Sequence, residues 1–412
     1  MAKLTVREIP VAQRRVLVRV DFNVPLDHGG VADDTRIRAT LPTLEYLIQQ
    51  KARAIVCSHL GRPKGKPDAA FSLRPAAERL RVLLDQRLGA DTQVGFCPET
   101  VGLQAREMAQ ALEPGHVLLL ENLRFQPQEE ANDPAFSREL AGLAEVYVND
   151  AFGSAHRAHA STVGVTQFLH PAAAGLLMEQ ELRYLGQALG NPQHPFVVIL
   201  GGAKVADKLP VMESLAHHAD VILVGGGMAY TFLAAQGHPV GASLCEPDKF
   251  DLARAVMARA ASDKHKFRLL LPVDHVVAAK LEAGAAHQTV SAIPAGQKAL
   301  DIGPRTREQY AAEIALAKTI VWNGPMGVFE VQPFDQGTVA IARAVADASR
   351  RGAVSIAGGG DSVAAIEAAG VARQITHIST GGGASLEFLA GVPLPGVAAL
   401  SEAGHGRGGD RR

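Results

Sequence analysis

Residues 196–215 read FVVILGGAKVADKLPVMESL, and this stretch indicates the fold class. Apolar residues 196–200 are followed by a glycine pair, by Lys204 and Lys208, and then by a pattern with helical spacing. A short buried strand that passes through glycines into a helix is typical of α/β proteins, in which helices cover parallel strands. The two neighbouring lysines indicate an anionic ligand, although the second glycine of a G-x-x-x-x-G-K-[ST] phosphate loop is missing.

The same alternation of short apolar runs and helical patterns extends through most of the chain. The predicted strands cover residues 16–24, 54–58, 117–121, 144–149, 196–200, 221–224, 269–272, 319–322 and 354–357. Between the two groups of strands, residues 172–195 have helical spacing up to a cluster of Gly190, Pro192 and Pro195. The sequence therefore predicts two α/β domains with parallel sheets, joined by a connector helix at about residues 174–190.

The composition limits the class of protein. The chain has 412 residues, 47% of them hydrophobic, which favours two or three domains with sizeable cores. Its 41 Lys and Arg against 42 Asp and Glu give no electrostatic argument for binding nucleic acid or acidic membranes. Three distant cysteines argue against a disulfide framework or zinc site. Without a secretory signal or a run of about 20 apolar residues, we expect a soluble cytoplasmic protein.

Polar and basic side chains follow several predicted strands of the first half. Asp21 and Asn23 alternate with apolar residues in the stretch VLVRVDFNVP. The basic residues near the other strand ends or at the start of the next helix are Arg36, His59, Arg62, Arg124 and Arg157. Each alone could be a solvated surface residue, but the carboxyl ends of parallel strands converge on one crevice. Together they predict a cationic basin for a small molecule with phosphate and carboxylate groups.

Glycine runs mark the second half. Triple glycines follow apolar runs at residues 225–227, 358–360 and 381–383, and each precedes a helical pattern. One such run can be a tight turn, but together with GGAKVADK they indicate a polyphosphate or nucleotide, because glycines and helix N-termini expose backbone N–H groups to anions. Asp361 could cap a helix or meet Mg²⁺, and Glu330 could bond a ribose hydroxyl. Pro210 leaves open whether the helix includes the two lysines.

These motifs resemble those of the phosphoglycerate kinase family. Nine stretches occur in the family's order between residues 16 and 402: RVDFNVP, SHLGRPKG, ENLRF, NDAFGSAHRAHAS, LGGAKVADK, GGGMAYTFL, WNGPMGVFE, GGGDS and STGGGASLE. The resemblance implies two doubly wound, three-layer α/β/α domains with a cleft between them. Residues 1–180 would bind 3-phosphoglycerate and residues 181–395 would bind ADP or ATP with Mg²⁺. Residues 396–412 would return to the first domain, with a disordered end.

The resemblance also implies roles for single residues. The phosphoglycerate ligands would be Asp21, Asn23, Arg36, His59, Arg62, Arg124 and Arg157. The nucleotide residues would be Lys204, Lys208, Asn323, Gly327, Glu330, Gly359, Gly360, Asp361 and Ser362, with Asp361 at the metal. Catalysis would fall to Arg36, Lys208 and the backbone amides of Gly382 and Gly383.

The resemblance implies a monomeric enzyme of glycolysis and gluconeogenesis that moves a phosphoryl group between 1,3-bisphosphoglycerate and ADP after domain closure. The acceptor is a carboxylate, which needs no general base, and the residue inventory fits this requirement. Two alternatives remain. A nicotinamide-dependent dehydrogenase would need the third glycine of G-x-G-x-x-G, but Tyr230, Val363 and Leu386 stand at that place. A non-enzymatic two-lobed binding protein is usually exported, which the expected cytoplasmic location does not fit.

Overall fold

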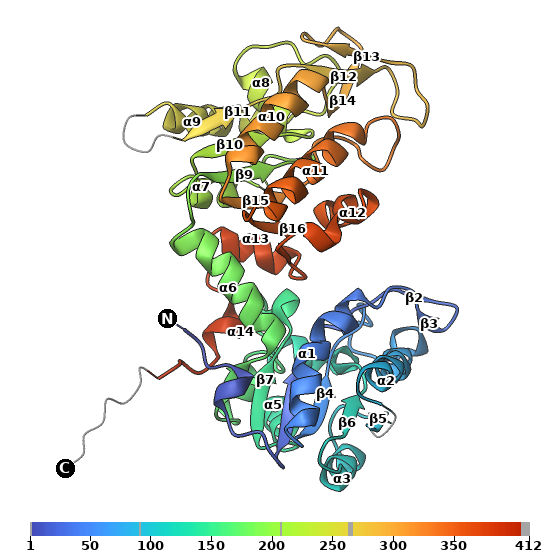
Figure 1. Ribbon diagram of the computed structural model, residues 1–412. Coiled ribbons are helices and arrows are strands. Elements are labelled where there is room, and N and C mark those ends of the chain that lie inside the picture. The colour runs from blue at the N-terminus through green and yellow to red at the C-terminus, as the bar shows by residue number, and fades with distance from the viewer. Residues whose placement is uncertain (1, 90–91, 207, 263–266, 405–412) are drawn as a thin grey trace, which may run out of the picture. The chain divides into compact units, whose positions relative to one another are not determined.

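The computed structural model describes residues 2–89, 92–206, 208–262 and 267–404 (Figure 1). Its contacts divide the chain into unit 1, Met1–Leu182 with Pro393–Arg412, and unit 2, Arg183–Val392. The boundary falls inside helix α6 (Leu176–Gly190), which begins after residue 174 because Ala172–Ala174 form a strand instead. The predicted disorder of the chain's end falls on residues 405–412 and lies outside the described residues.

Unit 1 is built on a six-stranded parallel sheet. Its order is β5 (Val94–Cys97), β6 (Val117–Leu120), β4 (Arg53–Cys57), β1 (Arg15–Arg19), β7 (Val146–Asn149) and β8 (Ala172–Ala174). Strand order along the chain reverses between β1 and β7, which makes this carboxyl edge the expected ligand site of a doubly wound sheet. A short hairpin, β2 (Leu26–Asp27) and β3 (Gly30–Val31), follows β1.

The predicted strand at residues 16–24 is too long. Strand β1 ends at Arg19, and the Asp21 carboxylate then accepts a hydrogen bond from the Asn23 amide at 3.1 Å. The Phe22 amide donates to the Ser58 hydroxyl at 2.8 Å. These side-chain hydrogen bonds replace the ladder bonds of a strand, as short polar side chains often do. Residues 20–24 therefore form a loop over the sheet edge.

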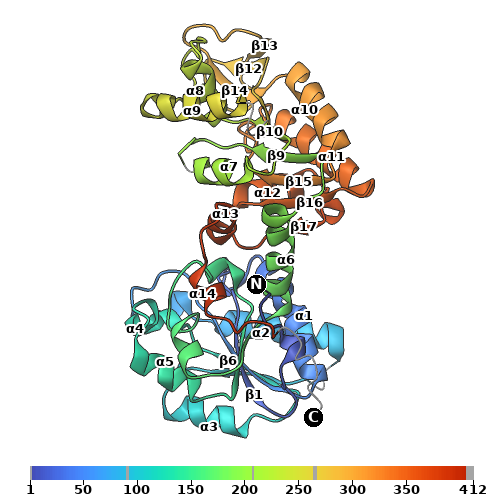
Figure 2. The same ribbon diagram turned by 90° about the vertical axis from the view of Figure 1, so that its left-hand side faces the viewer.

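Helices cover both faces of the unit 1 sheet, with α1 (Thr35–Gln49) and α2 (Arg74–Leu88) on one side (Figure 2). Alternate strand residues such as Val16 and Val18 are buried against apolar residues of these two helices, as the two-residue period of a strand requires. The remaining helices of the unit are α3 (Leu103–Ala111), α4 (Pro127–Glu130), α5 (Pro134–Ala141) and α14 (Pro395–Ala398).

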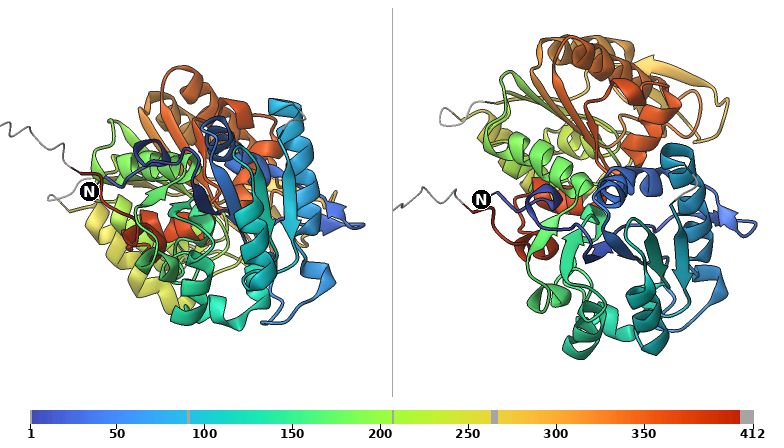
Figure 3. Two further views of the ribbon diagram at one scale, coloured as in Figure 1. Left: turned by 90° about the horizontal axis from the view of Figure 1, so that it is seen from below. Right: turned by 60° about the horizontal axis from the view of Figure 1, so that its bottom comes forward.

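The C-terminal segment packs within unit 1. The Gly396 amide donates to the Ala155 carbonyl at 2.8 Å, and the Leu4 amide donates to the Ser401 carbonyl at 2.9 Å. Lys3 forms a 2.7 Å ion pair with Glu402. Figure 3 shows this red segment beside the dark blue N-terminal segment.

Unit 2 has a second six-stranded parallel sheet. Its order is β11 (Arg268–Leu270), β10 (Val221–Val224), β9 (Phe196–Leu200), β15 (Thr319–Asn323), β16 (Val354–Gly358) and β17 (His377–Ile378). The order along the chain reverses between β9 and β15, so the loops after these two strands lie at the switch point. The predicted fold class, two doubly wound α/β units, is confirmed.

The helices of unit 2 also lie on both faces of its sheet (Figure 2). The core on one face joins β9 and β15 to α10 (Pro304–Leu316) and α11 (Gln336–Arg350). The other helices are α7 (Leu209–Leu215), α8 (Met228–Ala235), α9 (Phe250–Ala260), α12 (Gly360–Ala368) and α13 (Gly383–Leu389). The sequence analysis missed a three-stranded antiparallel sheet of β13 (His287–Val290), β12 (His275–Ala278) and β14 (Lys298–Ile302).

Candidate functional site

Polar residues gather at the carboxyl edge of the unit 1 sheet. Asp21 and Asn23 follow β1, His59 and Arg62 follow β4, Arg124 follows β6, Arg157 follows β7, and Arg36 stands in the first turn of α1. Hydrogen bonds connect several of them. The Arg36 guanidinium lies 3.2 Å from the Asp21 carboxylate and donates to the Asn23 carbonyl, also at 3.2 Å.

The same chain of contacts continues to the third strand end. The Asn23 side-chain oxygen accepts from the Gly61 amide at 2.9 Å, and the Gly61 carbonyl accepts from Arg124 Nη1 at 2.7 Å. The Arg124 side chain is only 7% exposed, and its Nε lies 3.1 Å from the Glu130 carboxylate without being directed at it. Burial and the nearby Arg157 and Arg19 lower the pKa of Arg124, although Glu130 opposes them. An oxyanion bound beside this guanidinium would stabilise its positive charge and so oppose the lowering of its pKa.

His59 is buried among cations. Its pKa is held well below the usual range, first by burial and then by Arg19, Arg124 and Arg36. The imidazole is therefore neutral at pH 7. Arg19 Nη2 lies 3.1 Å from His59 Nδ1, and because a guanidinium only donates, Nδ1 is the acceptor. The proton then resides on Nε2, where it can be donated to a ligand oxygen.

Arg19 belongs to this cluster, and the sequence analysis did not select it. The side chain is 1% exposed, and its Nε donates at 2.8 Å to the hydroxyl of Ser161. That hydroxyl donates at 2.6 Å to Glu129, a fully buried carboxylate. Arg19 stands two residues before the motif residue Asp21 in VLVRVDFNVP and alternates with apolar residues in the same way, so the motif contained the signal.

Two predicted residues are attached to this cluster more loosely. Arg62 is exposed, within the loop that follows β4. Arg157 Nε lies 3.2 Å from His156 Nε2, and its charge acts on Arg124 and His159. Hydrogen bonds thus link Asp21, Asn23, Arg36 and Arg124, directly or through Gly61. His59 bonds to Arg19 and lies close enough to Arg36 and Arg124 for their charges to lower its pKa, and Arg62 is exposed.

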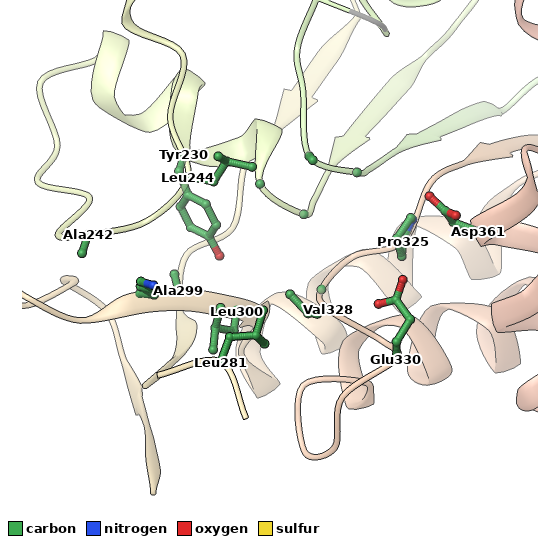
Figure 4. Close-up of a pocket in the computed structure, with 16 residues that line it drawn as sticks. Tyr230, Ala242, Leu244, Leu281, Ala299, Leu300, Pro325, Val328, Glu330 and Asp361 are labelled. Carbon is green, nitrogen blue, oxygen red and sulfur yellow. The ribbon is translucent and has the colours of Figure 1, made fainter. Parts of the chain in front are cut away.

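Unit 2 contains a pocket of about 440 Å³ beside the switch point of its sheet (Figure 4). Its lining includes three predicted residues, Gly327, Glu330 and Asp361. Figure 4 shows Glu330 and Asp361 at one end, with Tyr230, Ala242, Leu244 and Ala299 at the other. The pocket therefore has an acidic end and a largely apolar end, and the apolar end can take a flat, uncharged ring.

The two lysines precede helix α7. Lys208 is the N-cap residue, and Pro210 lies in the first turn, so the helix includes neither lysine. The Lys208 ammonium donates to the side-chain oxygen of Asn323, whose amide group donates to the Gly358 carbonyl at 2.8 Å. Lys204 is exposed in the loop. Asn323 thus links the ends of β9, β15 and β16.

The first triple glycine does not fit the prediction of an anion site. The amide of Gly225 donates to Leu200 and that of Gly226 to Met326, both at 2.9 Å. A Cβ on Gly226 would lie 2.6 Å from the Gly202 nitrogen. These glycines let the loops after β9, β10 and β15 approach backbone to backbone, and two of the amides are already bound.

The other two glycine runs begin helices. Gly359 is the N-cap of α12 with φ +91°, and a Cβ there would lie 3.0 Å from the side-chain nitrogen, Nδ2, of Asn323. Gly360 is the first residue of α12, Gly382 is the N-cap of α13 with φ +52°, and Gly383 is its first residue. The buried Ser362 hydroxyl accepts a hydrogen bond from the Gly324 amide at 2.6 Å, so it stabilises the loop that follows β15.

Asp361 is the candidate for a metal ligand. It lies in the first turn of α12, not at its N-cap, and its exposed carboxylate lines the pocket. Among the described residues, no group of three or more His, Cys, Asp or Glu could hold a metal ion by itself. A single carboxylate fits Mg²⁺ that is otherwise bound by phosphate oxygens and water.

The sequence analysis missed most of the apolar lining. The apolar lining comes from separate elements: helix α8, strand β14 and three loops contribute Tyr230, Leu300, Leu244, Leu281 and Val328. Leu244 and Leu281 are respectively 55% and 47% exposed, which is unusual for leucines. Isolated leucines carry no local motif, and β14 belongs to the sheet that was not predicted.

Comparisons with known proteins identify the family of the chain. The family model of phosphoglycerate kinase matches residues 6–392. The chain is 60% identical to the phosphoglycerate kinase of Koribacter versatilis over 405 residues, covering 97% of this chain and 100% of the relative. It is 58% identical to that of Acidobacterium capsulatum over 407 residues, covering 98% and 100%.

A solved structure of phosphoglycerate kinase from Coxiella burnetii matches with a TM-score of 0.86 and 41% identity, covering 97% of this chain and 98% of that one. One from Pyrococcus horikoshii matches with 0.80 and 33%, covering 96% and 98%. No helix among the described residues is long and apolar enough to cross a membrane. Because these matches cover nearly the full length of the chain, it belongs to the phosphoglycerate kinase family.

Proposed function

We propose that the chain catalyses the reversible, Mg²⁺-dependent transfer of the acyl phosphate of 1,3-bisphosphoglycerate to ADP, giving 3-phosphoglycerate and ATP. The observation that supports this proposal best is the position of the family-matched residues. They follow β1, β4, β6 and β7 in unit 1 and β9, β15, β16 and β17 in unit 2. All of them therefore stand at the carboxyl edges where doubly wound sheets bind ligands.

In this proposal unit 1 binds phosphoglycerate. Arg62, Arg124 and Arg157 bind its phosphate and carboxylate oxygens, since guanidinium groups pair with oxyanions through parallel hydrogen bonds. His59 donates its Nε2 proton, and Asp21 and Asn23 position the ligand's hydroxyl. Arg36 neutralises charge on the moving phosphoryl group. The Arg36 guanidinium lies 3.2 Å from the Asp21 carboxylate, and this contact holds it in position before the ligand binds.

Unit 2 binds the nucleotide in the same proposal. The base lies at the apolar end of the pocket, and Glu330 accepts a hydrogen bond from a ribose hydroxyl. Lys204, Lys208 and the first amides of α12 and α13 contact the phosphates. Asp361 holds Mg²⁺, which neutralises charge between phosphate oxygens when bound. Asn323 positions Lys208 for the transferred group.

The reaction needs positioning and charge neutralisation rather than a general base. The attacking carboxylate of 3-phosphoglycerate is ionised at neutral pH, because carboxyl pKa values lie near about 4. The Asp21 carboxylate is engaged by Arg36 and by the Asn23 amide, which suits a positioning role. We further propose in-line transfer after closure of the two units, with Lys208, Arg36 and the amides of Gly382 and Gly383 around the phosphoryl oxygens.

A coupled assay with Mg²⁺, ATP and 3-phosphoglycerate tests the activity directly. The proposal predicts turnover that disappears with a chelator. Absence of turnover with a folded protein would refute it. Small-angle scattering tests closure, since both ligands together should compact the protein more than either alone. We place the enzyme, as part of the same proposal, in the cytoplasm as a monomer that serves glycolysis and gluconeogenesis.

A further inference from the structure

Two buried charges beside the arginine cluster of unit 1 have no role in the mechanism above. Arg19 is the last residue of β1, and Glu129 belongs to helix α4; both side chains are buried. Burial raises the pKa of Glu129, and among the nearby arginines Arg19 opposes this rise most. A buried charge without a counter-charge is strongly unfavourable, so Arg19 and Glu129 depend on each other.

Ser161 joins the two charges. Its hydroxyl accepts a hydrogen bond from Arg19 Nε at 2.8 Å and donates to Glu129 Oε1 at 2.6 Å. Because a guanidinium only donates and the hydroxyl has a single proton, these two contacts fix the direction of both hydrogen bonds. The Ser161 amide donates to the second carboxylate oxygen, Oε2, at 3.0 Å. Ser161 therefore holds Glu129 in one orientation and links it to Arg19.

The other nitrogens of Arg19 point the link toward His59. Arg19 Nη1 donates to the Val20 carbonyl, and Nη2 lies 3.1 Å from His59 Nδ1. A donor at Nδ1 is compatible only with the neutral tautomer that carries its proton on Nε2. The chain of contacts from Glu129 thus ends on the ring nitrogen opposite the one that we assign to phosphoglycerate.

A second imidazole near Glu129 does not replace Arg19 as the counter-charge. His159 Nδ1 lies 3.8 Å from Glu129 Oε1, which is beyond hydrogen-bond distance. Burial, followed by Arg19 and Arg124, lowers the pKa of His159 to about 4. His159 is therefore neutral at pH 7, and the carboxylate is balanced mainly by the guanidinium of Arg19.

We propose that Glu129 and Ser161 are positioning residues for phosphoglycerate: they hold the Arg19 guanidinium against Nδ1 of His59 and so keep the Nε2 proton directed to the ligand. This inference rests on the proposed function, because it assumes that His59 donates to phosphoglycerate. We assign the two residues no contact with the ligand itself. Their effect should fall on binding, since His59 would donate to the ligand equally before and during phosphoryl transfer.

The first test removes the link at two points. Ser161→Ala leaves Arg19 Nε without its acceptor, and the guanidinium should turn away from His59 to recover a hydrogen bond. Glu129→Gln keeps the shape of the side chain but cannot accept both hydrogen bonds that Ser161 donates. Each variant should raise the calorimetric Kd and the KM for 3-phosphoglycerate about 3- to 10-fold and leave kcat within about twofold.

Nitrogen-15 NMR of the ligand-free protein examines the contact without any substrate. The chemical shift of a ring nitrogen depends on whether it carries a proton, and the signals missing in His59→Gln assign His59. At pH 7 the wild type should show an unprotonated Nδ1 and a protonated Nε2. In Ser161→Ala and Glu129→Gln the Nδ1 signal should move toward that of a protonated nitrogen, as the second tautomer becomes populated.

Ser137→Ala is the matched control. Ser137 lies in α5, is as buried as Ser161, and donates its hydroxyl to the Asp133 carbonyl at 2.7 Å. The control also loses one buried hydroxyl and some stability, but it should leave the Kd for 3-phosphoglycerate and the His59 signals unchanged. The inference is overturned if the control reproduces the effects of Ser161→Ala.

The remaining outcomes separate this inference from the proposed function. A wild type that neither binds nor phosphorylates 3-phosphoglycerate would refute both. With an active wild type, unchanged His59 signals or an unchanged Kd in Ser161→Ala and Glu129→Gln would overturn the positioning role alone. So would a lower kcat with normal binding, because it would place the two residues in the transfer step instead.

Discussion

At the carboxyl edge of the unit 1 sheet the polar groups are side chains, whereas at the same edge of the unit 2 sheet many are peptide groups. Arg19, His59 and Arg124 are buried and held by neighbours such as Ser161 and Gly61. In unit 2, by contrast, glycines such as Gly201 and Gly324 bring the loops together. Charged side chains in unit 1 are therefore held in place by networks of hydrogen bonds, whereas the close approach of peptide groups in unit 2 requires residues without a Cβ.

Loss of a single guanidinium should have the largest effect. Replacing Arg36 by Ala should lower kcat by about 10³-fold, about 4 kcal/mol, with a smaller change in binding, because we assign Arg36 to the transition state. Arg38→Ala on the same helix is the control, since Arg38 is exposed and pairs with Asp34 at 2.7 Å. Steady-state kinetics and circular dichroism of both variants check this, and nearly normal turnover in Arg36→Ala would contradict the assignment.

The glycine side of the comparison can be tested with a matched pair. Gly324 and Gly352 both have φ +99°, but a Cβ on Gly324 would lie 2.1 Å from the Gly201 carbonyl oxygen, and one on Gly352 would meet nothing within 4 Å. Gly352→Ala should cost about 1 kcal/mol for its backbone conformation. Gly324→Ala should cost about 3 kcal/mol more, measured as the free energy of unfolding in denaturant. Equal losses would show that close approach is unimportant there.

The buried imidazole of unit 1 predicts a pH dependence. The pKa of His59 lies well below its usual value of 6.5 in the folded protein, so below pH 6.5 the unfolded chain binds a proton that the folded protein excludes. Stability is thus lost as pH falls. Relative to His59→Gln, the wild type should lose about 2 kcal/mol of unfolding free energy between pH 7 and pH 5.

The exposed His170 supplies the control for this pH series. His170→Gln leaves the buried imidazole in place, so its stability should follow that of the wild type at every pH. If the curves of wild type and His59→Gln ran parallel, His59 would not be held neutral by burial and by its arginine neighbours.

The metal ligand should give the smallest of these effects. Asp361→Asn removes one carboxylate charge, and the Mg²⁺ concentration for half-maximal activity should rise about 10-fold, about 1.4 kcal/mol. Glu367→Gln, an exposed residue on the same helix, is the control and should leave the Mg²⁺ requirement unchanged. Initial rates across a Mg²⁺ titration decide between them, and an unchanged requirement in Asp361→Asn would place the metal elsewhere.

The parallel strands could be predicted from sequence because buried strands are continuous apolar runs bounded by glycine or polar residues. The run at residues 196–200 coincides with β9 for this reason. Edge strands such as Ala172–Ala174 and His377–Ile378 are too short to show a period. The antiparallel sheet was not predicted because three of the four residues of β13 are polar and exposed, and only Val290 packs against a core.

Site residues could be predicted where a strand end or glycine run carries them. Asp21, His59 and Asp361 were predicted in this way: the first two follow strands of unit 1, and Asp361 lines the unit 2 pocket. Lys298 and Leu281 could not be found, because they reach the pocket only through the pairing of β12 and β14 and the loop that follows β12. Gly226 belongs to a glycine run that was predicted to bind an anion, but its amide donates to the Met326 carbonyl. Tertiary packing, which no local pattern encodes, decides all of these cases.

A crystal structure with 3-phosphoglycerate and a Mg²⁺-bound, non-transferable ATP analogue would show which unit binds each substrate. We expect phosphoglycerate against Arg36, Arg124 and His59 in unit 1, and the nucleotide in the unit 2 pocket with its ribose at Glu330. Both small molecules bound by the same unit, or a nucleotide bound with no ligand at the arginine cluster, would contradict it.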